Sequence, residues 1–152
     1  MTSSALPQPY SPAWVKLPET YVGRVADALV EAGIGVAAWW NDPSDPRDAT
    51  IRVAPGAPGS ASSGRLALVW DEETGWRYGD FVAGEQGVRT QLAWASYLGT
   101  DVLPEPAAVA AALRGALDGT TPPMTTPTVY RSHTDLTDGL DTRLAAYTAT
   151  VG

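Results

Sequence analysis

The chain contains no cysteine among its 152 residues. This absence excludes disulfide bonds, thiolate zinc sites, iron–sulfur clusters and cysteine nucleophiles together. A domain of this length buries about 70% of the surface that its unfolded chain exposes, so a hydrophobic core can form without cross-links. The absence also fits a reducing compartment, and we expect a cytoplasmic protein that holds no metal and no cofactor.

Basic residues are scarce as well. The chain has 10 lysines and arginines against 17 aspartates and glutamates, which gives a net charge of -7, and the basic residues are scattered singly. Such a surface repels a phosphate backbone, so nucleic-acid binding is not expected. No apolar run approaches the roughly 20 residues of a membrane span, and we expect no membrane association. Residues 1–12 also lack the basic start and apolar core of a signal peptide.

Catalytic motifs are missing. Histidine occurs once, at His133 in the sequence RSHTD, so a hydrolase would need it as the sole imidazole base. A catalytic triad requires an acid that orients the base in space. Ser132 and Asp135 are only neighbours of His133 along an irregular, threonine-rich stretch. Because GxSxG, P-loop and GxGxxG motifs are absent too, we predict no catalytic residue.

A run of three carboxylates at residues 71–73 invites a catalytic or metal-binding interpretation. Paired carboxylates can divide acid and base roles, and their oxygens suit Mg²⁺ or Ca²⁺. No second acidic cluster at a recognisable spacing converges on them. Consecutive carboxylates at a hairpin tip are usually solvated, so we expect no metal site here.

Hydrophobic periodicity predicts helices near both ends of the chain. The first begins at Pro18, because proline suits the first helical position, and it ends at Gly33, with apolar residues at three- and four-residue spacing in between. The second begins at residues 104–106 and ends at Gly119. A short amphipathic helix is expected at residues 138–149, after an extended linker rich in proline and threonine.

Alternating apolar residues predict strands between the first two helices. Residues 36–41 and 49–54 are two of these strands. Residues 65–83 are predicted to form a β-hairpin, in which Gly75 takes a positive φ in the turn DEETG. Residues 88–97 are predicted to form a further strand, although their spacing also suits a helix.

These elements give an α+β fold, with a four- or five-stranded antiparallel sheet flanked by an N-terminal and a C-terminal helix. The connections between strands are too short for parallel crossovers. We assign residues 1–17 to an irregular arm, 18–119 to a single domain, and 120–152 to a linker with a short helix. Residues 55–64 are predicted to be a flexible loop, because nothing in them could anchor a core.

Two helices cannot cover both faces of such a sheet. We expect them to pack on one face. The other face is then open, shielded by a terminal arm, or buried against a partner.

Two stretches resemble a known family. LALVWDEETGWRYG at residues 66–79 and YLGTDVLPEPAAVAAALRGALDG at residues 97–119 are similar to small actinobacterial, Streptomyces-type proteins of unknown function. The resemblance rests on a WDEExGW hairpin and a YLGxDVLPxP helix entry. It sharpens the expected fold, but it brings no activity, cofactor or catalytic residue.

Tryptophan is unusually frequent. Trp39 and Trp40 are adjacent in a predicted strand, so their side chains point to opposite faces of the sheet. One of them therefore lies away from the helices, where a bare indole would favour association. We predict an aromatic binding surface on the open face, formed by one of this pair with Trp76, Tyr78 or Trp94. Two alternatives remain, in which a terminal arm covers that face or a homodimer buries it.

Two functions are consistent with these patterns. The first is a non-catalytic interaction or regulatory module that binds a protein partner, or a second copy of itself, through this aromatic face. The second is a small-ligand-binding protein or small hydrolytic enzyme with a pocket between sheet and helix. Its residues to test are Trp76, Tyr78, Asp71 and His133.

Overall fold

The computed structural model describes residues 6–42, 46–54, 66–85, 88–99, 101–120 and 122–149. The flexible loop predicted at 55–64 lies outside these residues. The helices are α1 (Pro12–Val15), α2 (Glu19–Glu31), α3 (Pro106–Asp118) and α4 (Leu140–Ala149). The strands are β1 (Val36–Asp42), β2 (Asp48–Val53), β3 (Leu66–Asp71), β4 (Gly75–Glu85) and β5 (Val88–Leu98).

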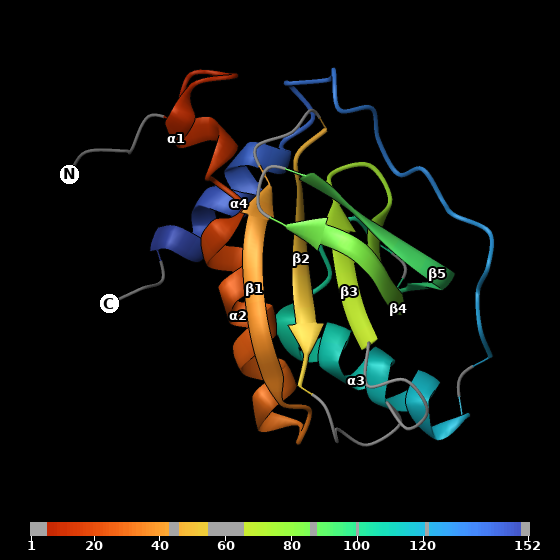
Figure 1. Ribbon diagram of the computed structural model, residues 1–152. Helices are drawn as coiled ribbons and strands as arrows, with labels where there is room; N and C mark the ends of the chain where they lie inside the picture. Colours follow the sequence, from red (N-terminus) through yellow and green to blue (C-terminus); the bar gives the residue numbers. More distant parts are fainter. Residues whose placement is uncertain are drawn as a thin grey trace.

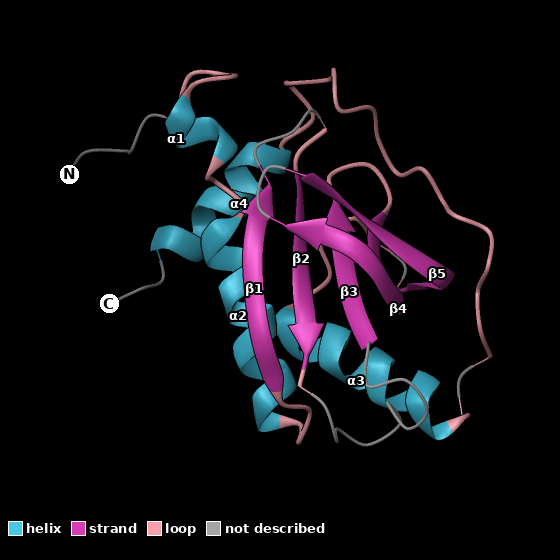
Figure 2. Ribbon diagram, in the orientation of Figure 1, coloured by secondary structure: helices cyan, strands magenta, loops and turns pink. Residues whose placement is uncertain are grey.

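The strands form one five-stranded antiparallel sheet in the order β1-β2-β3-β4-β5, so each strand pairs with the next one along the chain (Figure 2). This confirms the predicted α+β fold. The stretch 88–97, whose spacing also suited a helix, is a strand because it pairs with β4. Gly75 has a φ of 76° in the β3–β4 turn, as its position in the hairpin predicted.

Helices pack on one face of the sheet, as expected, with α2 and α3 behind the strands in Figure 1. Apolar side chains of α2, α3 and α4 join those of the strands in one buried core. At its centre, Trp76 donates its indole N–H to the hydroxyl of Tyr21 at 3.0 Å, and Trp70 donates to the carbonyl of Val102 at 2.7 Å. Among the described residues, no helix has the length and apolar character needed to cross a membrane.

The opposite face is covered by the sheet itself. The distal half of the β4–β5 hairpin bends back over β1 and β2. There the ring centres of Phe81 and Trp40 are 6.4 Å apart, and the guanidinium carbon of Arg52 lies 4.3 Å from the centre of the Phe81 ring. Ala67 and Val69, which point to this face from β3, are completely buried. In the described part of the chain no terminal arm covers this face, and the face is not open, because the long strands β4 and β5 curl over it.

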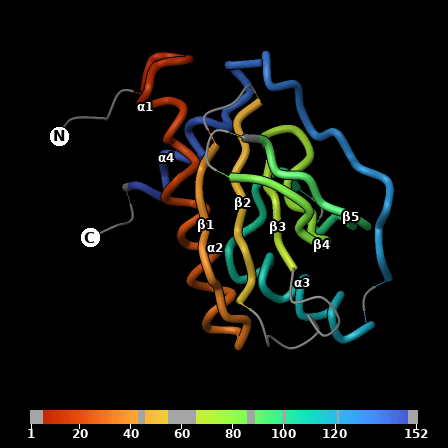
Figure 3. Tube along the Cα trace, in the orientation of Figure 1, coloured from red at the N-terminus to blue at the C-terminus, as the bar shows by residue number. Residues whose placement is uncertain are grey.

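Helices α1 and α4 lie next to each other (Figure 3), and Trp14 of α1 donates its indole N–H to Asp141 of α4 at 2.8 Å. The arm expected to be irregular contains the short helix α1, in which Ser11 accepts a hydrogen bond from the N–H of Trp14 at 3.2 Å and Pro12 occupies the first turn. The C-terminal helix expected at 138–149 is present as α4. It packs on α2, where the rings of Tyr21 and Tyr147 are 4.9 Å apart.

Candidate functional site

Among the described residues, Trp94 on the edge strand β5 is the most exposed large apolar side chain, with 88% of its surface accessible. It sits in a β-bulge: Tyr78 pairs with Ser96 and Asp80 pairs with Ala93, so Gly79 alone faces two residues of β5. A side chain at Gly79 would not fit, because its Cβ would lie 2.7 Å from the carbonyl oxygen of Ala93. The glycine therefore permits the bulge, and the bulge presents Trp94 to solvent.

The backbone of Trp94 is strained. Its φ is 59°, in the left-handed region that bulky side chains rarely adopt. Tyr10 is the other non-glycine residue with positive φ in the described part of the chain, but its ring packs 4.7 Å from that of Trp14. The ring of Trp94 packs against no other aromatic ring of the described residues. Strain without a compensating contact, in a residue that is also exposed, is typical of a side chain kept for recognition.

Both edges of the sheet carry a bulge. On β1 the pairing passes from Val36–Val53 to Ala38–Arg52, so Ala37 is an extra residue that forms a bulge. On β5 the bulge contains Trp94. Bulges interrupt the regular row of hydrogen-bonding groups that an added strand needs. The edges therefore favour recognition through side chains over strand addition.

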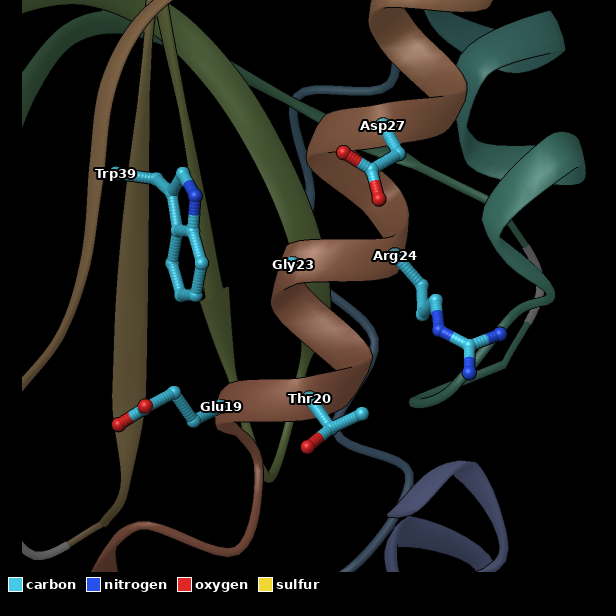
Figure 4. Close-up of a pocket in the computed structure, with 6 residues that line it drawn as sticks. All are labelled: Glu19, Thr20, Gly23, Arg24, Asp27 and Trp39. Atoms are coloured by element: carbon cyan, nitrogen blue, oxygen red, sulfur yellow. The ribbon is translucent and has the colours of Figure 1, made fainter. Parts of the chain in front are cut away.

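A groove lies between α2 and the other edge strand, β1 (Figure 4). Its volume is about 340 Å³. The indole of Trp39, which is 37% exposed, forms one wall and comes within 3.2 Å of the position that a Cβ on Gly23 would take. The remaining lining residues, all from α2, are Glu19, Thr20, Arg24 and Asp27.

The five aromatic residues singled out in the sequence do not form one surface. Trp76 is completely buried in the core and Tyr78 packs against it. Trp40 lies under Phe81 on the covered face. Of the five, Trp39 and Trp94 are the exposed ones, and they belong to the two opposite edge strands.

The acidic turn is not solvated, contrary to expectation. Asp71 accepts hydrogen bonds from the N–H groups of Glu73 and Thr74 at 2.8 and 2.7 Å, and its other oxygen accepts from the side chains of Thr74 and Arg77. Asp71 is therefore a turn cap with both oxygens occupied. Glu72 is completely buried.

A buried ion cluster holds Glu72. Arg47, just before β2, is fully buried and donates to the Glu72 carboxylate from Nε and Nη2 at 3.1 and 2.9 Å. The same Nη2 donates to Asp141 of α4 at 2.8 Å, and the guanidinium lies 3.7 Å from the centre of the Trp14 ring. Arg131 adds a further bond to Glu72 at 3.1 Å. The cluster thus ties α1 and the C-terminal segment to the tips of two hairpins.

Little in the sequence indicates this cluster. Arg47 is one basic residue in the turn-rich stretch DPSDPRD, and no spacing links it to Glu72. Complementary charges in two neighbouring hairpin turns were the available signal. They do not predict burial, because most such pairs lie at the surface.

His133 is held by the acidic turn but forms no triad. Its Nδ1 lies 2.9 Å from the carboxylate of Glu73, and its backbone N–H donates to the same oxygen at 2.8 Å. These bonds lower the pKa of Glu73. The hydroxyl of Ser132 bonds to Thr134 at 2.7 Å instead of to the histidine. The residues expected for a hydrolase are therefore engaged separately.

A cavity of about 240 Å³ beside α4 is polar, but its charges are paired. Arg143 donates to Asp101 at 2.5 Å, and Arg131 forms a two-point ion pair with Asp138. These pairs lower the pKa values of Asp101 and Asp138. Within the described residues, no group of three or more metal-ligating side chains of the His, Cys, Asp or Glu type is present.

Comparison with known proteins gives one match. The sequence pattern of a family described as one of unknown function matches residues 21–115, which span α2, all five strands and most of α3. The match leaves out α1 and α4, whose Trp14 and Asp141 complete the ion cluster. No curated protein and no solved structure matches the chain.

Proposed function

Because the chain belongs to the family of unknown function DUF6292, its role has to be inferred from its own surface, and we propose that it is a non-catalytic protein-interaction module that binds a partner protein through Trp94. The observation that carries this proposal is an indole that is 88% exposed on a backbone with a φ of 59°.

Neither property of Trp94 stabilises the fold. Placing a bulky residue in the left-handed region costs about 1–2 kcal/mol, and an exposed indole gains little from burial. Burial of the indole against a partner would contribute to the free energy of binding. Tryptophan is also among the residues most enriched at interface hot spots. The bulge also fixes the backbone of Trp94 before binding, which lowers the backbone entropy lost on contact.

The arrangement of polar groups supports a non-catalytic role. Asp71 is fully used as a turn cap, Trp76 is in the core, and His133 is bonded to Glu73. These three groups line no common cavity among the described residues, so they do not support the ligand-binding or hydrolytic alternative.

The proposal is tested with two variants of one position. Trp94→Gly removes the indole and relieves the backbone, whereas Trp94→Ala removes the indole and keeps the strain. Immobilised wild-type protein and both variants are incubated with an actinobacterial lysate, and bound proteins are quantified by mass spectrometry. The captured protein is then purified and titrated calorimetrically.

We expect one protein to bind wild type at a fixed stoichiometry and to bind both variants at least tenfold more weakly. A Val30→Ala variant, which removes an exposed apolar side chain from α2, should bind like wild type. Equal binding by wild type and the Trp94 variants, or failure of any protein to bind stoichiometrically, would contradict the proposal.

A further inference from the structure

Helix α2 carries an acidic stripe interrupted by one glycine. Glu19, Gly23, Asp27 and Glu31 follow one another at four-residue intervals, so they lie along one side of the helix. The gap at Gly23 is where the indole of Trp39 packs, within 3.2 Å of the position a Cβ would take. A larger residue would push the ring away, so the glycine brings an aromatic face into the acidic row.

The charges around this indole are not evenly arranged. In Figure 4 the carboxylate of Glu19 lies below the ring of Trp39, and that of Asp27 lies on the front of α2, level with the upper part of the ring; both residues line the groove with Trp39. The guanidinium of Arg24 extends on the other side of the helix. The two carboxylates start from positions about 12 Å apart along the helix axis. A partly exposed ring and two carboxylates therefore line the same groove of about 340 Å³.

This combination fits one kind of ligand. The face of an indole attracts cations, and carboxylates in the same groove strengthen that attraction while repelling anions. A guanidinium is planar, stacks on an aromatic face and offers several donors to carboxylates, which a lysine ammonium does not match. From the geometry we infer that the Trp39 groove binds an arginine side chain of a protein or peptide partner. The site is independent of Trp94, on the opposite edge strand.

The test uses matched peptides and one assigned signal. The probe is the peptide Ac-Gly-Gly-Arg-Gly-Gly-amide, and its control carries citrulline, which has the shape of arginine without the charge. The ¹⁵N-labelled protein gives one indole N–H signal for each tryptophan, and the signal of Trp39 is assigned by its absence in Trp39→Phe. We expect the arginine peptide to shift this signal to saturation, with an affinity at least tenfold higher than that of the citrulline peptide.

Variants of the groove separate its parts. Replacing both carboxylates, as Glu19→Gln with Asp27→Asn, should lower the affinity for the arginine peptide at least threefold. Raising the salt concentration should lower this affinity further. Gly23→Ala should displace the ring and weaken binding while the fold is retained. Trp94→Gly should bind the peptide like wild type, because Trp94 lies outside the groove. A negative result for the groove would therefore leave the proposal for Trp94 untouched.

Two results would overturn the inference. Equal affinity for the arginine and citrulline peptides would show that charge is not recognised. Arginine binding that shifts other signals but leaves Trp39 unmoved would place the site elsewhere.

Discussion

Thr50 of β2 and Thr90 of β5 share a hydrogen bond of 2.6 Å between their buried hydroxyls, across the covered face of the sheet. The two strands are not neighbours in the sheet, so this bond exists only because the β4–β5 hairpin bends back. The bond therefore ties β5, the strand that carries Trp94, to the packing of the sheet.

Replacing both threonines of this pair should cost less than the sum of the two single replacements. Thr50→Val or Thr90→Val alone leaves a buried hydroxyl without its partner and should destabilise the fold by about 1–3 kcal/mol. The double variant removes both hydroxyls while keeping the shape, so its cost should be smaller than the sum. Urea unfolding of the four proteins measures the coupling. Additive losses would show that the bond does not hold the hairpin down.

Arg47 should contribute far more to stability than Arg143. Both side chains of the Arg47–Glu72 pair are 0% exposed, and Arg47→Met would leave a buried carboxylate short of its main partner, at a cost of about 3–5 kcal/mol. The Arg143–Asp101 pair is exposed by 47% and 44%, so Arg143→Met should cost less than about 1 kcal/mol. Denaturant titration of both variants compares them. Similar losses would contradict the burial of the cluster.

Trp94→Gly should be more stable than Trp94→Ala by about 1 kcal/mol, because glycine adopts a positive φ without strain. Elsewhere in a strand the order is reversed, which makes the sign diagnostic. The difference in stability between the two variants is measured from their midpoints of urea unfolding. A more stable alanine variant would mean that the bulge relaxes once the indole is removed.

The C-terminal segment should detach in acid before the sheet unfolds. The Arg131 guanidinium holds the pKa of Asp138 below its ordinary value of 3.8, and the hydrogen bond from His133 lowers that of Glu73 below 4.5. Because these pKa values are lower in the folded state, their stabilisation is present above the ordinary values. It is lost as the pH falls through the folded ones, from about pH 5 downward.

The indole signals of two tryptophans distinguish this local step from global unfolding. Trp14 donates to Asp141 of α4 at 2.8 Å, whereas Trp70 donates to Val102 in the core. On acidification the Trp14 signal should change first, and Arg131→Met should move that change to higher pH. A single step shared by both signals would argue against a separable C-terminal segment.

The helices and the hairpin turn could be predicted because their signals are local. Apolar spacing, a starting proline and a terminal glycine define α2 and α3 within one stretch of chain, and DEETG fixes a turn wherever it is placed. Adjacency in a strand also correctly placed Trp39 and Trp40 on opposite faces, since side-chain alternation is a property of the backbone.

The candidate sites depended on contacts that no local pattern records. The bulge at Trp94 is a mismatch of register between two strands, and Gly79 is needed because of a carbonyl on the neighbouring strand. Arg47 is buried because side chains from α1, the β3–β4 turn and α4 converge on it.

The sequence by itself determined the elements, their order and the antiparallel class, because periodicity and short connections act within a few residues. Only the tertiary structure decided which aromatic side chains are buried and which remain exposed. That choice depends on how far β4 and β5 bend and on which distant charges find partners, and both are set by the free energy of the whole packed molecule.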